Sequence, residues 1–266
     1  MSNLIGVILA LSASVAWSIA PLLYKTGSTE SAWDDLFSLA LATFISALPL
    51  LLIGAHLSTT MLIYGALFSL LGPVLGTYMY LVSLRHASVG LATLVSYAYV
   101  ILVPLLSIDI SLRHLLAGAL AMLGLYIAMR ARGGSVKGIA LAFSSALLYA
   151  LSFLVIGSAA AVTDPWSFTL ARAIGFLLPV ALIEMARGKS PKISPKIFLA
   201  GIVSYGVGGP LFILSVYYLG PVIPSIISAL SPVLTQVLAI FALGERPDFY
   251  TALGFLVMIA AILLAV

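Results

Sequence analysis

The sequence predicts an all-α integral membrane protein with ten transmembrane helices, arranged as two inverted five-helix repeats. Three observations predict this fold class. Of the 266 residues, 63% are hydrophobic and only 8% are charged, whereas a soluble domain has about a quarter charged residues. Ten apolar runs have roughly the length, about 20 residues, that a helix needs to cross a bilayer. Similar patterns recur 132 residues apart in the two halves of the chain.

The ten apolar runs are separated by short polar connections. The longest connections are 25–34 and 187–195, and neither is long enough to form a second folded domain. The chain begins with an apolar run that has no basic segment before it and no small-residue cleavage site, so we expect a spanning helix there. The runs cover 4–24, 35–53, 60–84, 88–108, 114–130, 137–158, 165–186, 196–219, 221–243 and 249–266.

The repeat is clearest in the first helix of each half. The segment 6–17 matches 138–149, and in each copy a stripe of small residues at helical spacing ends in one aromatic side chain, Trp17 or Tyr149. Small residues allow helices to approach closely in lipid, where packing drives helix association. We therefore expect each stripe to be a helix-packing face.

An odd number of helices in each half makes the second copy enter the membrane from the opposite side. The sequence thus predicts one transmembrane domain built from two repeats, 1–132 and 133–266. Ten of the 12 lysines and arginines lie in loops that follow odd-numbered helices, and only Arg113 lies in the other loops. By the positive-inside rule, this bias favours a multi-pass protein of the cell membrane with both termini outside.

Two apolar runs in corresponding places carry helix breakers. Gly72-Pro73 lies inside 60–84, and Gly208-Gly209-Pro210 lies inside 196–219. Proline lacks the amide proton and its ring clashes with the preceding turn, so we expect kinks. Interrupted helices at matching places in two halves point to a transporter's binding site. The prolines are not in repeat register, which predicts kinks more than one turn apart. The expected hinge residues are Gly72, Pro73, Gly208, Gly209, Pro210 and Pro232.

Arg172 is a charged residue inside the seventh run, about 10 Å along the helix axis from its start. Its counterpart in the first half, near Ala40, is uncharged. A charge inside the membrane is costly and indicates a functional site by default. A guanidinium offers a fork that binds a carboxylate or phosphate. Two structural alternatives are snorkelling to the interface and hydrogen bonding to carbonyls freed by a neighbouring kink.

Aromatic residues within the runs predict a cavity suited to amphipathic or cationic solutes. Trp17 and Tyr149 hold equivalent positions, and Tyr78 and Tyr205 lie near the helix breakers. Tyr99, and one of the neighbours Tyr217 and Tyr218, are interpreted as packing residues. Most of the serines and threonines around Pro232 are expected to bond back to their own helix. The expected substrate-binding residues are Trp17, Tyr78, Tyr97, Tyr149, Arg172, Tyr205 and Gln236, the last because its buried amide needs partners.

Several kinds of chemistry find no support in the sequence. The eight acidic residues lie in loops or within about one turn of a run's end, so a carboxylate proton relay deep in the bundle is not expected. There is no cysteine, and the three histidines have no ligand spacing, so we expect no metal, cofactor or disulfide. The net charge of +4 is dispersed between apolar runs and does not indicate a nucleic-acid partner. No nucleophile–base pair is visible, so an enzyme is not expected.

Four short segments resemble motifs of the EamA-type transporters, which belong to the drug/metabolite transporter superfamily. Leu243-Gly-Glu-Arg-Pro247 resembles the Leu-Gly-Glu-Arg signature of that family, and 228–235 resembles its Ser-Leu-x-Pro-Val-x-Thr helix. Ala16-Trp17 and Leu170-Ala-Arg-Ala173 are similar to its tryptophan and helix-7 arginine positions. The first half departs from the pattern, since Val100 replaces the helix-4 proline and 111–114 lacks the signature. The family usually has cytoplasmic termini, which opposes the charge bias.

The resemblance implies export of metabolites, amino acids or drugs. Together with the broken helices, it leads us to expect a secondary transporter of small organic solutes, working by alternating access through a central cavity. Its partners would be the solute and the lipid bilayer; the sequence does not fix the oligomeric state, and a monomer is compatible with it. Two alternatives remain open at this point. One is a membrane-embedded enzyme acting on lipid, and the other is a non-catalytic assembly or sensor subunit, which predicts a bundle packed solid.

Overall fold

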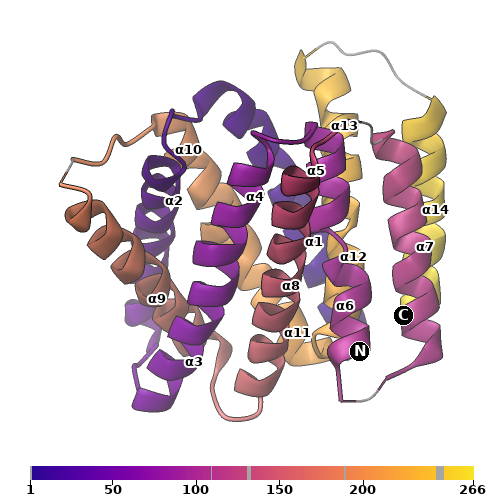
Figure 1. Cartoon of the computed structure of the whole chain (residues 1–266). Helices are drawn as coiled ribbons and strands as arrows, with labels where there is room; N and C mark the ends of the chain where they lie inside the picture. The colour runs from indigo at the N-terminus through magenta and orange to yellow at the C-terminus, as the bar shows by residue number, and fades with distance from the viewer. Residues whose placement is uncertain (1, 109, 131–132, 189, 244–248) are drawn as a thin grey trace.

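The computed structural model describes residues 2–108, 110–130, 133–188, 190–243 and 249–266. Over these ranges the chain is helical and forms no strand, apart from an isolated bridge between Ala87 and Gly134. Eight continuous helical stretches of the described chain are long and apolar enough to cross a membrane, and some of them join two or three of the elements named below. Two shorter apolar stretches cover 222–238 and 249–265. The fold is therefore that of a multi-pass helical membrane protein (Figure 1).

The first half of the chain contains α1 (Ser2–Gly27), α2 (Ala32–Ala47), the 3-10 helix η1 (Leu48–Ile53), α3 (Thr59–Ser69), the π-helix η2 (Leu70–Gly76), α4 (Thr77–Ser83), α5 (Val89–Ser96), α6 (Tyr99–Leu106) and α7 (Leu112–Met129). The second half contains α8 (Val136–Ala159), α9 (Pro165–Ala186), α10 (Pro195–Gly201), the π-helix η3 (Ile202–Gly208), α11 (Gly209–Leu219), α12 (Val222–Ser228), α13 (Leu230–Leu243) and α14 (Phe249–Ala265).

Polar residues at the ends of the apolar runs start the helices. Ser58, Ser135 and Ser194 each accept a hydrogen bond from a backbone N–H in the first turn of the following helix, which satisfies a donor that has no partner within the helix. Asp164 does the same for α9 through the N–H groups of Trp166 and Ser167. Burial acts to raise the pKa of Asp164, but these hydrogen bonds outweigh burial and hold the pKa below its ordinary value.

Both chain termini lie at the same end of the bundle (Figure 1). The opposite end holds the connections 28–31, 84–88 and 187–194 and most of the described lysines and arginines; we call it the cation-rich end. It contains Arg85, Arg130, Lys137, Arg187, Lys192 and Lys196. The charge asymmetry seen in the sequence is thus a separation between the two ends of the molecule.

The two interrupted helices are wound as π-helices at equivalent places. Residues 70–76 and 202–208 are 132 apart at both ends, so η2 and η3 are in strict repeat register. Pro73 lies inside η2, whereas Pro210 is the second residue of α11, directly after η3. The expectation that the two irregularities are more than one turn apart was wrong. That expectation used the prolines to locate the irregularities. The feature that repeats is the π-helix, which has one more residue in each hydrogen-bonded turn than an α-helix.

The fourth run of each half is also divided. α5 and α6 are separated at Tyr97 and Ala98, and α12 and α13 are separated at Ala229. Tyr97 and Ala229 are 132 residues apart, so these interruptions are equivalent as well. Each half therefore contains two helices that are interrupted near the middle of the bundle.

The first helix of each half packs against the interrupted helix of the other half. Ser215 Oγ in α11 donates to the carbonyl of Gly6 in α1 (2.8 Å), and Ser145 Oγ in α8 donates to the carbonyl of Gly76 in η2 (2.8 Å). The small stripes expected from the sequence are buried in these contacts, since Ala10, Ala13 and Ala142 are inaccessible to solvent. The two halves therefore interlock through their small-residue faces.

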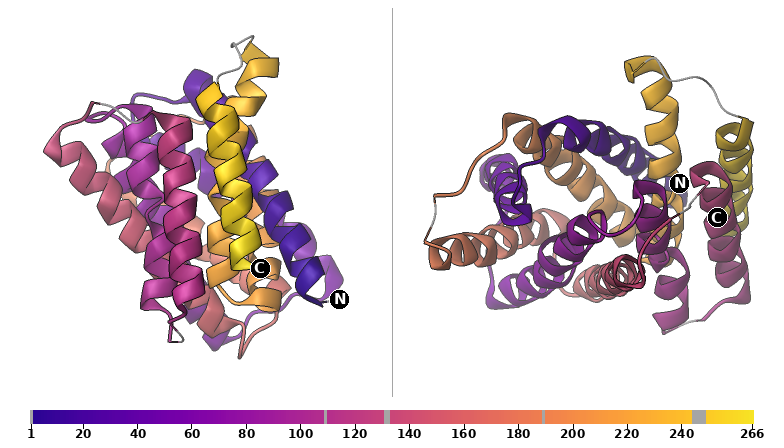
Figure 2. Two further views of the ribbon diagram at one scale, coloured as in Figure 1. Left: turned by 90° about the vertical axis from the view of Figure 1, so that its right-hand side faces the viewer. Right: turned by 45° about the horizontal axis from the view of Figure 1, so that its top comes forward.

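At one edge of the bundle, α7 and α14 lie side by side in all views (Figures 1 and 2). A Cβ atom placed on Gly254 would lie 2.6 Å from the carbonyl oxygen of Gly124, so glycine is required for this close approach. Ala121 and Ala261 are fully buried on the two helices. These two helices, one from each half, form a flanking pair beside the remaining spans.

Candidate functional site

A central cavity of about 670 Å³ lies between the two halves. It reaches the cation-rich end, where Ser28, Leu84 and Val89 line it. Of the described residues in the connections 54–58, 107–111 and 160–164, at the other end, none lines it. Phe68, Phe153 and Phe212 lie on its wall, and the rings of Phe153 and Phe212 are tilted by 44° with centroids 4.6 Å apart. The cavity is thus open toward one end of the bundle only.

Trp17 lines the cavity and connects α1 to the other half by a hydrogen bond. Its indole N–H donates to the carbonyl of Ser204 in η3 (2.8 Å). A Cβ on Gly208 would lie 2.8 Å from the indole ring, so the ring occupies the space that the absent side chain leaves. The ring also packs against Phe212, with centroids 5.0 Å apart.

Tyr149, the counterpart of Trp17, also lines the cavity. Its hydroxyl lies 2.8 Å from Thr77 Oγ1, and the same threonine oxygen lies 2.9 Å from the hydroxyl of Tyr205. Thr77 belongs to α4 in the first half, while Tyr149 and Tyr205 belong to the second. Three hydroxyl groups from three helices thus form one hydrogen-bonded chain at the cavity wall.

Two further hydrogen bonds join the divided helices of the two halves. Tyr97 OH lies 2.7 Å from Ser231 Oγ, and Tyr99 OH lies 2.7 Å from Ser228 Oγ. Tyr97 lines the cavity, as do Tyr99 and Ser231. Tyr99 is almost fully buried, which agrees with its interpretation as a packing residue, but it also forms part of the wall.

Arg172 is 3% exposed in the middle of the bundle, which rules out snorkelling to the interface. Its Nη2 donates to the carbonyl of Tyr205 in η3, as the alternative of bonding to a carbonyl near a kink predicted. The guanidinium rests against Gly209, where a Cβ would lie 2.5 Å from Nη2. Nε is buried without a hydrogen-bond partner, and no described carboxylate pairs with the side chain.

Arg172 also borders a second, smaller cavity. This space measures about 280 Å³ and lies between α2, α9 and α11, with Leu50, Trp166 and Pro210 in its lining. The guanidinium therefore stands between the central cavity and this side cavity.

Gln236 lines the central cavity and has two partners. Its Nε2 donates to Met129 Sδ (3.2 Å), and its Oε1 accepts from Thr251 Oγ1 (2.7 Å). Its amide is therefore shared between the cavity wall and the flanking pair of α7 and α14. This placement agrees with the expectation that the amide needs partners on another helix or in a cavity.

The structure brings together Trp17, Tyr97, Tyr149, Arg172, Tyr205 and Gln236 from the expected binding residues, and Pro73, Gly209 and Pro232 from the expected hinge residues. It places Tyr78 elsewhere, stacked on Trp33 with centroids 4.5 Å apart. Gly72 and Gly208 pack against α8 and α1, behind the wall. Sequence reasoning missed Tyr24 and Tyr80, which line the cavity. Tyr24 lies seven residues, two helical turns, after Trp17 in α1, and Tyr80 lies two residues after Tyr78 on the other side of α4.

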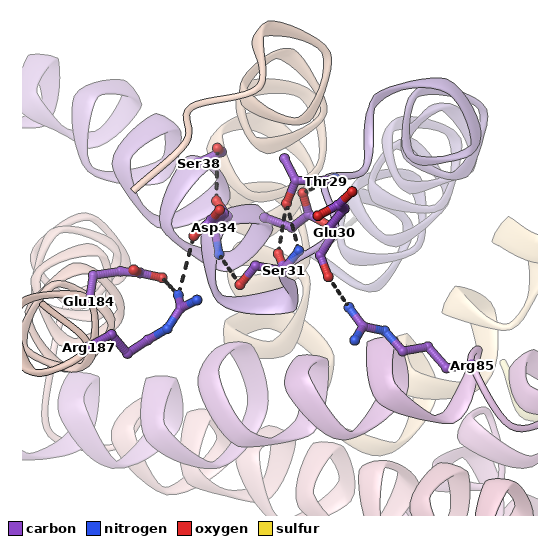
Figure 3. Close-up of polar contacts among 9 residues, drawn as sticks. Thr29, Glu30, Ser31, Asp34, Ser38, Arg85, Glu184 and Arg187 are labelled. Carbon is purple, nitrogen blue, oxygen red and sulfur yellow. Dashed lines mark hydrogen bonds and ion pairs between the residues drawn. The ribbon is translucent and has the colours of Figure 1, made fainter. Parts of the chain in front are cut away.

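A polar cluster braces the cation-rich end beside the cavity (Figure 3). Arg187 Nη1 donates to Glu184 Oε1 and to Asp34 Oδ1 (3.3 Å), which joins α9 to α2. Arg85 Nη2 donates to the carbonyl of Glu30 (2.9 Å), which joins the end of α4 to the connection before α2. Asp34 and Glu184 lie near helix ends, as the sequence indicated, but both are buried. Neither lines the central cavity.

A multi-pass bundle built of two interlocked halves around a central cavity is the architecture of a membrane transporter. The chain belongs to the EamA-like transporter family, whose model matches it twice, over residues 4–130 and 136–266. The resemblance read from the sequence is thereby confirmed, and it is consistent with the drug/metabolite transporter superfamily. Residues 244–247 of the Leu-Gly-Glu-Arg-Pro motif lie outside the described residues.

Two comparisons agree with this membership. A protein of Archaeoglobus fulgidus described as an uncharacterized transporter is 25% identical over 277 residues, covering 98% of each chain. A solved structure described only as "Crystal structure of protein" superposes with a TM-score of 0.80 at 16% identity, over 98% of this chain and 96% of that one, and supports the fold. The protein is therefore a membrane transporter and not an enzyme. The central cavity also opposes the assembly-subunit alternative, which predicted a solid bundle.

Proposed function

We propose that the protein is a secondary transporter that exports small organic solutes, such as metabolites, amino acids or drugs, by alternating access. The observation that carries the proposal is the central cavity, which lies between the two halves and reaches only one end of the bundle. A cavity of about 670 Å³ is in the range of sites for small organic molecules. Its aromatic and hydroxyl-bearing wall suits a solute with an apolar body.

The proposed motion uses the paired irregularities of the two halves, 1–132 and 133–266. In this proposal the ten runs are ten spans, with α5–α6 and α12–α13 each counted as one. The π-helices η2 and η3 and the interruptions at Tyr97 and Ala229 are the places where backbone geometry already departs from a regular helix. They are our candidate hinges, together with the neighbouring Pro73, Pro210 and Pro232. Rocking of the halves would open the other end and close the cation-rich end.

The charge bias assigns the cation-rich end to the cytoplasm in this proposal. Both termini are then outside, and the described state presents its cavity to the cytoplasm, where a solute to be exported is loaded. The cavity is formed within one chain, so one chain is the proposed transporting unit.

The test is solute flux in proteoliposomes that contain the purified full-length chain. Efflux of a panel of radiolabelled amino acids, organic anions and organic cations is measured against protein-free liposomes. Saturable flux of at least one solute, inhibited by an excess of the same solute, supports the proposal. A folded preparation that gives no saturable flux with any member of the panel counts against it.

A further inference from the structure

We propose that the solute recognised by this cavity is an organic anion, with a carboxylate or phosphate monoester that binds Arg172 and an apolar body that lies along the aromatic wall. This inference rests on the proposed transport function and names the substrate class of the same site. It differs from the expectation of cationic solutes that the aromatic residues alone suggested.

The first observation is the charge of the cavity wall. Of the described residues that line the cavity, Arg172 is the one with a formal charge, and no carboxylate among them balances it. Its Nη2 donates to the carbonyl of Tyr205, and its Nε has no acceptor among the described residues. A buried cation is costly to leave without a counter-charge. An anionic group entering the cavity supplies that charge, whereas an amine would be repelled.

The second observation comes from the other half of the molecule. η2 forms the same π-helix as η3, in strict register, but the position equivalent to Arg172 is Ala40. The carbonyl of Tyr205 needs a donor from outside η3, because the residue five positions on is Pro210, which has no N–H, whereas the equivalent residue after η2, Tyr78, has one. The bond to Tyr205 uses Nη2 and leaves Nε without a partner, so it does not satisfy the whole guanidinium.

The third observation is the space made for the guanidinium. Gly209 leaves room for it, and a Cβ there would lie 2.5–3.0 Å from Nη2, Cζ and Nη1. The equivalent residue of the first half is Thr77, which has a side chain and bonds Tyr149 and Tyr205. The second half thus has Arg172 and Gly209 where the first half has Ala40 and Thr77. The guanidinium and the hydroxyl chain meet at Tyr205, whose carbonyl accepts from Arg172 and whose hydroxyl lies 2.9 Å from Thr77 Oγ1. The charge of the cavity wall therefore comes from the second half alone.

Three probes with the same ring test the charge preference: 4-hydroxyphenylacetate, its uncharged amide and tyramine. Binding to the detergent-solubilised full-length chain is followed by tryptophan fluorescence, since Trp17 lies on the cavity wall. We expect the carboxylate to bind at least about tenfold more tightly than either other probe. In Arg172→Gln we expect the three affinities to fall within about twofold of one another.

Further variants separate recognition from folding. Arg172→Lys keeps the charge but loses the planar fork, so we expect an intermediate carboxylate affinity. Gly209→Ala keeps the arginine but displaces it, and should also weaken carboxylate binding. Arg113→Gln, at the opposite end of the bundle, is the matched control and should leave binding unchanged. Thermal unfolding of each variant in detergent shows whether the fold is retained.

The outcomes distinguish this inference from the transport proposal. Equal affinity for all three probes, or an unchanged preference in a folded Arg172→Gln protein, overturns the anion assignment even if some solute is transported. Carboxylate binding through Arg172 without flux supports the anion site and overturns transport. Competition by phosphatidylglycerol, but not by phosphatidylcholine, would assign the site to a lipid headgroup and overturn the solute assignment.

Discussion

The indole N–H of Trp17 lies 2.8 Å from the carbonyl oxygen of Ser204, and this hydrogen bond joins the first helix of one half to the π-helix of the other. A π-helix leaves carbonyls without their ordinary i+4 partners. The carbonyl of Ser204 already accepts the N–H of Gly209, five residues on, and the tryptophan adds a second donor from across the repeat interface, at the wall of the central cavity.

Replacing Trp17 by phenylalanine keeps a ring in the cavity wall but removes the donor to Ser204. We expect the free energy of unfolding to fall by about 1 to 2 kcal/mol and the transport rate to fall with it. Thermal unfolding in detergent and flux in proteoliposomes measure the two effects. Trp33→Phe is the control, because Trp33 stacks on Tyr78 away from the cavity lining. Equal loss of flux in both variants would contradict a specific role for Trp17.

Gly208→Ala inserts a methyl group 2.8 Å from the Trp17 ring. The ring must shift, so we expect solute binding to weaken through the altered cavity wall. At the equivalent Gly76, a Cβ would lie 3.6 Å from the Tyr149 ring, an ordinary contact, and 3.1 Å from the carbonyl of Leu71. Gly76→Ala should therefore have the smaller effect on the cavity. Fluorescence-monitored solute binding compares the pair, and a larger effect at Gly76 would contradict the prediction.

Thr77→Val removes the oxygen shared by Tyr149 and Tyr205. Both phenols lose a buried partner, so we expect a loss of about 1 to 3 kcal/mol in the free energy of unfolding. Thr43→Val is the control, since Thr43 bonds only to the carbonyl of Leu39 in its own helix. Combining Thr77→Val with Tyr149→Phe should cost less than the sum of the single changes. Strict additivity would show that the hydroxyl chain is not energetically coupled.

Arg187→Gln leaves Asp34 and Glu184 without their shared counter-charge at the cation-rich end. Because Arg187 is partly exposed, we expect a moderate loss of about 1 to 2 kcal/mol in stability. Adding Glu184→Gln should restore part of it, since a neutral amide tolerates burial better than an unpaired carboxylate. Arg85→Gln, which loses only a bond to the backbone of Glu30, is the control. Differential scanning fluorimetry compares the melting temperatures, and no recovery in the double variant would contradict the mechanism.

Cysteine labelling tests the proposed orientation, and the chain has no native cysteine to interfere. Lys192 and Val162 are exposed at opposite ends of the bundle. With intact cells and a membrane-impermeant maleimide, we expect Val162→Cys to be labelled and Lys192→Cys to be protected. Cell lysis should make both react. The reverse pattern in intact cells would establish the orientation usual in the family.

The sequence predicted the helical membrane fold and much of the cavity wall, because both follow from patterns that repeat. Trp17 and Tyr149 were paired by the repeat, and the structure brings both to one cavity. Tyr78 was chosen for its nearness to Pro73, but nearness along the chain does not fix the face of a helix. Tyr78 packs against Trp33, whereas Tyr80, two residues on in α4, lines the cavity. The interruption at Tyr97 and Ala98 within the fourth run was not visible in the sequence; Tyr97 is hydrogen-bonded there to Ser231 of the other half.

The interlocked packing of the halves constrains the order in which the chain can reach its native structure. Gly6 accepts its hydrogen bond from Ser215, 209 residues later in the chain. During synthesis, α1 enters the membrane long before its partner helix exists. Its small-residue face therefore stays without its native packing partner until α11 is inserted. The first five helices are therefore an unfinished assembly until the second half is inserted. Cooperative closure of the two halves, rather than independent folding of each, is the expected last stage of biogenesis.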